Sequence, residues 1–366
     1  MGYRYIGSKA RIADEIIEYI NRTTFVEDGG FFIDAFSGTG VVAERAALSG
    51  WPVYVNDMMS NAVIMSEARL LSVEDVPFSN LNGYRNAIRL LNALPGQEGF
   101  IWREYSPASA MFQLSERRYF IEDNAKKIDA IATAIHTWRT QGIISQQEYV
   151  LLLSDLISAV NDVANIAGTY GCFLSRWTTQ AKEPLNLQVS ELKNKAIIYK
   201  TSNCDVFEIE STSNDIVYLD PPYTKRQYAS YYHILETIVQ GDHPKVEGVS
   251  GLRPWKDKAS VFCYKKKALD ALSDLILKQK AKRVILSYSN EGNIELDDLI
   301  GKLSPYGDIK LVELKTIGRY RPNKVAVENR SEVNEYLVDF SRKQGENEQT
   351  TNTRAAPFVR SRTAFI

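Results

Sequence analysis

The 366-residue sequence is poor in the residues that form disulfides and metal sites. Its cysteines stand far apart and make no zinc or redox spacing: Cys172, Cys204 and Cys263. Its histidines are equally scattered, and we expect packing or surface roles for them: His136, His233 and His243. The sequence therefore predicts free thiols and no metal ion.

Long apolar runs and a strong net charge are also missing. No stretch of about 18 apolar residues occurs, so no membrane-spanning helix is predicted. The amino end lacks a signal-peptide core, and Ile6 stands where a myristoylation signal has Ser or Thr. We therefore expect a cytoplasmic protein. The net charge of −1 gives no general attraction to nucleic acid, so any such contact must come from local clusters.

The most informative stretch is DIVYLDPPY, residues 215–223, an apolar strand that ends at Asp220. Proline fixes φ and donates no hydrogen bond, so the chain must leave the sheet at Pro221 and Pro222 as a stiff loop. Asp220 then lies at the carboxyl end of its strand, where open α/β sheets bind ligands. A carboxylate, an unused carbonyl and the ring of Tyr223 together suit an exocyclic amino group on a planar base.

The chemistry of such an amino group explains this choice of residues. N6 of adenine is a poor nucleophile because its lone pair is delocalised into the ring. Asp220 and the carbonyl of Pro221 could accept its two protons and free that lone pair. Tyr223 could stack on a base that has left the duplex, which offsets roughly 1–3 kcal/mol of the unstacking cost. The alternative is a strand end in which the prolines only make a turn.

A second motif lies within residues 31–57. An apolar strand ending at Asp34 turns through Gly38 and Gly40 into an expected helix, and the next strand ends at Asp57. In nucleoside-binding βαβ units such glycines let the backbone approach the ligand, and such an acid binds the ribose. The missing third glycine disfavours a dinucleotide and hence an oxidoreductase. A ligand with an amino-acid end and a nucleoside end, such as S-adenosylmethionine, fits better.

The remaining chain predicts an α/β fold, a Rossmann-like sheet with a helical insertion. Apolar residues recur at helical spacing between residues 72 and 167, which we predict to be that insertion. Residues 1–71 and 168–341 are then expected to form the sheet domain, and residues 342–366 a disordered tail. Further strands are predicted at residues 197–199, 284–288 and 335–340, and a helix at residues 12–20.

Basic residues near the central motif and in the insertion are candidate DNA contacts. The insertion carries arginines among aromatic residues, the catalytic loop is followed by two basic residues, and residues 245–267 are rich in lysine. The candidates are Arg117, Arg118, Lys225, Arg226, Arg253, Lys256 and Lys258. Solvated surface charges remain the alternative for each.

The motifs and their order resemble the alpha-class DNA N6-adenine methyltransferases, the family that includes the Dam methylases. The matching segments are YIGSK (5–9), DAFSGTG (34–40), Asp57, Cys204-Asp205 and DPPY (220–223). The resemblance implies transfer of a methyl group from S-adenosylmethionine to N6 of a flipped adenine in double-stranded DNA. A cognate restriction endonuclease is a partner that it also allows. No recognition sequence is implied, because the insertion matches only in its placement.

The resemblance also implies a role for each matching residue. Around the cofactor, Tyr5 and Lys9 would flank the methionine end, Asp34 and Phe36 would line it, Asp57 would hold the ribose and Asp205 would meet the adenine. The loop from Asp220 to Tyr223 would bind the target base. Three alternatives stay open: a cytosine-N4 methyltransferase, which usually has Ser in place of Asp220, an enzyme acting on RNA, and a catalytically inactive nucleic-acid-binding subunit.

Overall fold

The computed structural model describes residues 5–24, 30–112, 115–314 and 334–343. Its strands are β1 (Phe32–Asp34), β2 (Val53–Asn56), β3 (Tyr199–Ser202), β4 (Ile216–Leu219), β5 (Arg283–Ser289), β6 (Gly307–Glu313) and β7 (Glu335–Arg342). They form one sheet in the order β3-β2-β1-β4-β5-β7-β6. The first five strands in that order are parallel, whereas β7 runs antiparallel between β5 and β6.

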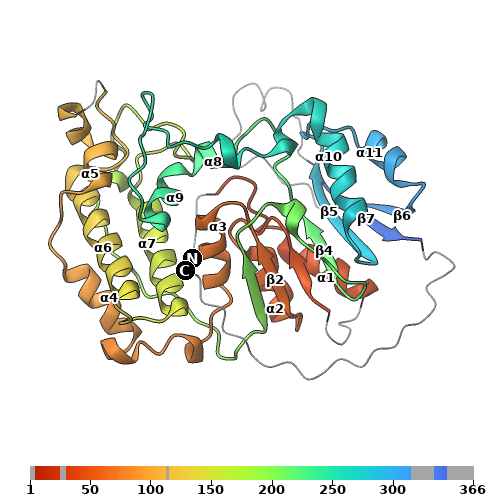
Figure 1. Cartoon of the computed structure of the whole chain (residues 1–366), viewed down its shortest axis with the longest axis horizontal. Helices are drawn as coiled ribbons and strands as arrows, with labels where there is room; N and C mark the ends of the chain where they lie inside the picture. The colour runs from red at the N-terminus through yellow and green to blue at the C-terminus, as the bar shows by residue number, and fades with distance from the viewer. Residues whose placement is uncertain (1–4, 25–29, 113–114, 315–333, 344–366) are drawn as a thin grey trace.

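Helices cover both faces of the sheet (Figure 1). Successive side chains of a strand point to opposite faces, so Phe32 packs on one side and Ile33 on the other. The helices α1 and α2 pack against the first face, and α10 and α11 pack against the second. Their bounds are α1 (Ala13–Thr23), α2 (Val41–Leu48), α10 (Lys265–Lys278) and α11 (Leu296–Leu303).

Six of the seven strands lie at or beside stretches that the sequence predicts, and the helix predicted at residues 12–20 is α1. The sequence does not predict β6. This strand lies at the edge of the sheet, and Gly307 is its only fully buried residue. Its sequence, GDIKLVE, therefore lacks the continuous apolar run that marks a strand buried on both faces.

Between β2 and β3 the described chain contains α-helices and short 3₁₀ turns but no named strand. The α-helices are α3 (Ser60–Ala68), α4 (Tyr84–Ala93), α5 (Phe100–Tyr105), α6 (Glu122–Thr140) and α7 (Gln146–Val163). Ser145 and Glu148 form a capping box at the start of α7 and fix where that helix begins. The predicted apolar stripes correspond to α6 and α7.

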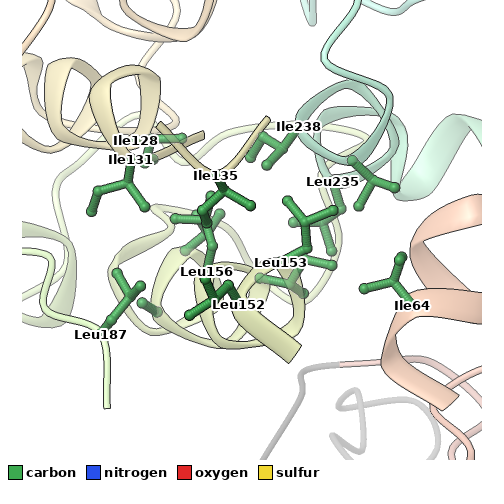
Figure 2. Close-up of a cluster of buried hydrophobic side chains, with 14 of the residues drawn as sticks. Ile64, Ile128, Ile131, Ile135, Leu152, Leu153, Leu156, Leu187, Leu235 and Ile238 are labelled. Atoms are coloured by element: carbon green, nitrogen blue, oxygen red, sulfur yellow. The ribbon is translucent and has the colours of Figure 1, made fainter. Parts of the chain in front are cut away.

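The helices α3 to α7 between β2 and β3, called the helical part below, have their own hydrophobic core, shown in Figure 2. Ile131 and Ile135 of α6 meet Leu152 and Leu156 of α7 there. Leu235 and Ile238 join the same core from α9 (His233–Gln240). The helix α9 lies within residues 168–341, which are predicted to form the sheet domain, but its apolar side chains pack in this core. The short helix α8 (Tyr228–Tyr231) links α9 to the loop that carries Asp220.

The predicted tail begins inside the sheet, because β7 continues to Arg342. The rest of that prediction, residues 344–366, lies outside the described residues. None of the helices in the described ranges has both the length and the apolar character needed to cross a membrane.

Candidate active site

A cavity of about 550 Å³ lies at the carboxyl ends of the parallel strands, a size typical of small-molecule sites. Val55 and Tyr218 pair with Asp34 across the sheet, so the residues that follow them, Asp57 and Asp220, reach the same edge. Nine of the predicted catalytic and cofactor-binding residues line this cavity: Tyr5, Lys9, Asp34, Phe36, Gly38, Asp57, Asp205, Asp220 and Pro222.

Lys9 lines the cavity and forms ion pairs with two carboxylates. Its Nζ lies 3.1 Å from Oδ1 of Asp220 and 3.1 Å from Oε2 of Glu335. The hydroxyl of Tyr223 donates to Oε1 of Glu335 at 3.2 Å, and Lys9 Nζ lies 5.3 Å from the centre of the Tyr223 ring. Burial alone would lower the pKa of Lys9, but Asp220, Tyr223 and Glu335 outweigh it and raise that pKa well above its usual range. The ammonium is therefore buried and fully charged.

Asp220 keeps acceptor capacity for a ligand. Burial raises its pKa to about 6, although Lys9 opposes the shift. The side chain is therefore mostly ionised at neutral pH, with Oδ1 paired to Lys9 and Oδ2 as the second acceptor. Pro221 is buried beside it, and no described residue donates a hydrogen bond to the Pro221 carbonyl. Two acceptors thus stand next to each other in the loop.

Asp34 is a buried carboxyl group that lacks a partner on one oxygen. Its Oδ1 is inaccessible to solvent and has no hydrogen-bond partner among the described residues. Burial, together with the nearby Asp220 and Asp57, raises the pKa of Asp34 to about 8. An unsatisfied buried carboxyl is costly to the folded protein. Such a group suits a ligand that brings a positive charge.

The glycine turn is held in place by Asp57. One of its oxygens accepts from the backbone N–H of Gly38 at 3.0 Å, and the other accepts from that of Met59 at 2.9 Å. Burial raises the pKa of Asp57 to about 6. Each carboxylate oxygen has a second lone pair, so Asp57 can still accept from a ligand.

Gly40, predicted as a cofactor residue, does not line the cavity. Its φ is +74°, and a Cβ at this position would lie 2.5 Å from Cα of Ser66 in α3. The close approach of α3 and the positive φ explain why glycine stands here, and the predicted cofactor role of Gly40 stays an expectation.

Aromatic rings form the wall of the cavity near Asp205. Phe36 meets Phe262 edge to face at 5.6 Å, and Phe207 stacks on Phe262 at 6.0 Å. Asp205 caps the 3₁₀ turn Val206–Glu208 by accepting from the N–H of Phe207 at 3.0 Å. Sequence reasoning missed Phe207 and Phe262. Phe207 lies close to a predicted site residue, whereas no local pattern marks Phe262.

The amino-terminal segment is fastened to α8 and α9. The ring of Tyr5 stacks on Tyr232 at 4.2 Å, and the N–H of Ile6 donates to the Tyr232 hydroxyl at 2.7 Å. The Tyr228 hydroxyl donates to the carbonyl of Ile6 at 3.1 Å. Gly7 has a φ of +76°, and a Cβ there would lie 2.7 Å from the Tyr228 hydroxyl. These contacts help to position the segment that carries Lys9.

Arg117, a predicted DNA contact, belongs to the protein interior. It is 3% exposed, and its guanidinium lies 2.9 Å from the carboxylate of Glu104. It also donates to the carbonyls of Gly248 and Val249. These bonds tie Arg117 to the chain that follows α9, so the predicted DNA contact of Arg117 is corrected to a structural role.

Arg253 and Lys258 are also engaged within the protein. Arg253 forms an ion pair with Asp242 at 2.8 Å, and Lys258 forms one at 2.6 Å with the buried Glu236. Lys258 additionally lines the cavity. Both side chains remain partly exposed, so their predicted contact with DNA stays an expectation.

The other predicted DNA contacts are accessible. Lys225, Arg226 and Lys256 are exposed. Arg118 is partly exposed and pairs with Glu116 at 2.8 Å. Contact with DNA remains the expectation for these four residues.

Within the described part of the chain, no three or more His, Cys, Asp or Glu side chains are grouped so as to hold a metal ion. The three cysteines are free thiols there: Cys172 is exposed, Cys204 is partly buried and Cys263 is buried.

Residues 5–299 match the family described as D12 class N6 adenine-specific DNA methyltransferase. The chain belongs to this family. The D12 match includes both predicted motifs and the whole helical segment between β2 and β3, but it ends before β7 and Glu335.

Curated relatives of this D12 chain are modification enzymes. The chain is 33% identical over 340 residues to the Type II methyltransferase M.FokI of Planomicrobium okeanokoites, covering 91% of this chain and 52% of that protein. It is 34% identical over 357 residues to the modification methylase StsI of Streptococcus sanguinis, covering 95% of this chain and 53% of that protein. It is 30% identical over 329 residues to the Type II methyltransferase M.NlaIII of Neisseria lactamica, covering 89% of this chain and 94% of that protein. The chain spans about half the length of the first two relatives.

Proposed function

We propose that this member of the D12 family transfers a methyl group from S-adenosylmethionine to N6 of an adenine flipped out of double-stranded DNA. One observation carries the proposal. The mostly ionised, buried Asp220, held by Lys9 at the end of β4, lines the same cavity as Asp34, whose Oδ1 has no hydrogen-bond partner among the described residues. The family description supports adenine N6 as the acceptor. The order of the motifs supports placement with the alpha-class, Dam-like enzymes.

The side chains in the cavity fit S-adenosylmethionine. Asp34, which lines the cavity, is the carboxyl group expected to meet an ammonium group, and Asp57 offers acceptors to the ribose hydroxyls. Asp205 is the acceptor for the amino group of the cofactor's adenine, with Phe36 and Phe262 as apolar walls. When bound, the cofactor supplies a methyl group already activated by a sulfonium.

Lys9 connects the cofactor half of the site to the catalytic half. The resemblance of the YIGSK segment supports an expected position of Lys9, together with Tyr5, at the methionine end of the cofactor. The Lys9 ammonium is shared between Asp220 and Glu335, so it also fixes the side chain that meets the target base.

The catalytic loop holds the acceptors for the target amino group. Oδ2 of Asp220 and the carbonyl of Pro221 accept hydrogen bonds from the two N–H groups of N6. These bonds draw the nitrogen toward tetrahedral geometry, which makes its lone pair available. The tight Pro221-Pro222 loop holds these acceptors rigidly. Tyr223 is the stacking platform for the flipped base, and its bond to Glu335 fixes the orientation of the ring.

DNA recognition is assigned to two parts of the molecule. Residues 103–119 in the helical part, including Arg118, are the expected site of sequence readout. The exposed Lys225, Arg226 and Lys256 are expected to contact phosphates and to set affinity without reading sequence. Because the relatives are named as modification methylases, a cognate restriction endonuclease is the expected partner.

Expression in a host that lacks DNA methylation, followed by long-read sequencing, tests the proposed function. We expect N6-methyladenine within one short recognition sequence. N4-methylcytosine would point to the cytosine enzymes instead. An unmodified genome, together with measurable binding of S-adenosylmethionine, would indicate a catalytically inactive DNA-binding subunit.

A further inference from the structure

Glu335 occupies a central place in the site although sequence reasoning passes over it. It is the first residue of β7 and is 6% exposed. Its backbone is fixed by pairing with Ser289 of β5 and by accepting from the N–H of Leu314 at 2.9 Å. The side chain therefore starts from a rigid strand end and reaches Lys9, which lines the cavity.

The two oxygens of Glu335 have different partners. Oε2 accepts from Lys9 at 3.1 Å, and Oε1 accepts from the Tyr223 hydroxyl at 3.2 Å. One carboxylate thus connects the cation that pairs with Asp220 to the aromatic ring of the catalytic loop. Removing it would release both neighbours at once.

Glu335 also changes the electrostatics of Asp220. A single ammonium, Lys9, serves two carboxylates at equal distances, so its charge is divided between them. Asp34, Tyr218 and Tyr228 are the other titratable groups that interact with Asp220 or its surroundings. An Asp220 that was paired with Lys9 alone would be a weaker acceptor for an amino proton.

We propose that Glu335 is a positioning residue for methyl transfer. It holds Lys9 and the Tyr223 ring beside Asp220, and it prevents Lys9 from fully neutralising that carboxylate. The inference rests on the proposed function for its catalytic meaning, but the contacts on which it stands do not depend on the substrate.

The substitution Glu335→Gln separates charge from shape. Glutamine can accept from Lys9 through its oxygen and donate to the Tyr223 hydroxyl through its amide, so the packing is kept. With one carboxylate left, Lys9 pairs wholly with Asp220. We expect the pKa of Asp220 to fall by about one unit and turnover to fall by up to about tenfold, because Brønsted behaviour passes only part of a pKa change on to the rate. Affinity for S-adenosylmethionine should stay close to wild type.

The pKa of Asp220 is measured by a pH titration followed by ¹³C NMR of aspartate labelled at the side-chain carboxyl carbon. The variant Asp220→Asn assigns the signal. The acid limb of the pH profile of kcat/KM is measured in parallel and should move in the same direction. Glu148→Gln is the matched control. It changes a similarly buried glutamate, which caps α7 and does not line the cavity, and should leave both readouts unchanged.

Tyr223→Phe tests the second contact by itself. It removes only the hydroxyl that Glu335 holds, so turnover should fall while the pKa of Asp220 stays in place. An unchanged Asp220 pKa in Glu335→Gln would overturn the proposal, even with reduced turnover, because Glu335 would then serve the fold alone. If the wild type methylates no DNA, the proposed function fails, but the NMR titration still decides on Glu335.

Discussion

Replacing Asp34 by asparagine should stabilise the cofactor-free protein at alkaline pH. Burial, with Asp220 and Asp57 nearby, raises the pKa of Asp34 from 3.8 to about 8. The folded protein then holds this proton more tightly than the unfolded chain, so stability falls as the pH rises from about 4 to 8. A difference of about 4 pKa units corresponds to roughly 5–6 kcal/mol. This is an upper limit, because water entering the cavity weakens the burial penalty.

Urea unfolding at pH 5.5 and at pH 8.5, without cofactor, measures this effect. The variant should exceed the wild type in stability at pH 8.5, and the difference should shrink toward pH 5.5, where Asp34 is protonated and resembles asparagine. Calorimetry on the same samples should show S-adenosylmethionine binding about ten- to hundredfold more weakly, because a charged hydrogen bond worth roughly 1.5–3 kcal/mol is lost.

Asp215→Asn is the control for this experiment. Asp215 is also buried, but it lies at the opposite end of β4, and its oxygens accept from the N–H groups of Phe31 and Thr212. The same substitution there should destabilise the protein at every pH and leave cofactor affinity unchanged. A stability difference for Asp34→Asn that is independent of pH would refute the reasoning.

Three further predictions concern the glycine turn, Asp57 and the DNA surface. Gly40→Ala should lower thermal stability, because the new Cβ would lie 2.5 Å from Cα of Ser66 and the residue has a φ of +74°; a melting temperature equal to wild type would contradict this. Asp57→Ala should weaken S-adenosylmethionine binding in calorimetry by at least 1 kcal/mol, because the ribose acceptor and the anchor of Gly38 are lost together. Lys225→Ala combined with Arg226→Ala should reduce the salt slope of DNA binding by up to about 1.8 without changing the methylated sequence; a changed sequence would move readout to this loop.

The strand ends of the site could be predicted because their signals are local. Asp34, Asp57 and Asp220 each follow an apolar run and precede a turn, and parallel strands bring such ends to one edge of the sheet. The glycine turn and the Pro221-Pro222 loop add conformational signals that depend only on neighbouring residues. These parts of the prediction needed no knowledge of distant contacts.

Partners that are distant in sequence could not be predicted. Glu335 meets Lys9 only because β7 inserts between β5 and β6, an arrangement that no local pattern encodes. The sequence shows the charges of Arg117 and Arg253 but not the carboxylates that compensate them, so both were predicted to contact DNA. The place of α9 in the helical core has the same origin, because its apolar stripe does not reveal which neighbour it covers.

Nucleoside mass spectrometry after reaction with isotopically labelled S-adenosylmethionine shows directly which base is methylated and whether Asp220 is needed for the transfer. Purified wild-type protein and Asp220→Ala are each incubated with unmethylated double-stranded DNA and the cofactor carrying a labelled methyl group. We expect labelled N6-methyladenine from the wild type, and from Asp220→Ala none above background although it still binds the cofactor. Label in N4-methylcytosine, or N6-methyladenine formed by Asp220→Ala at the wild-type rate, would contradict this expectation.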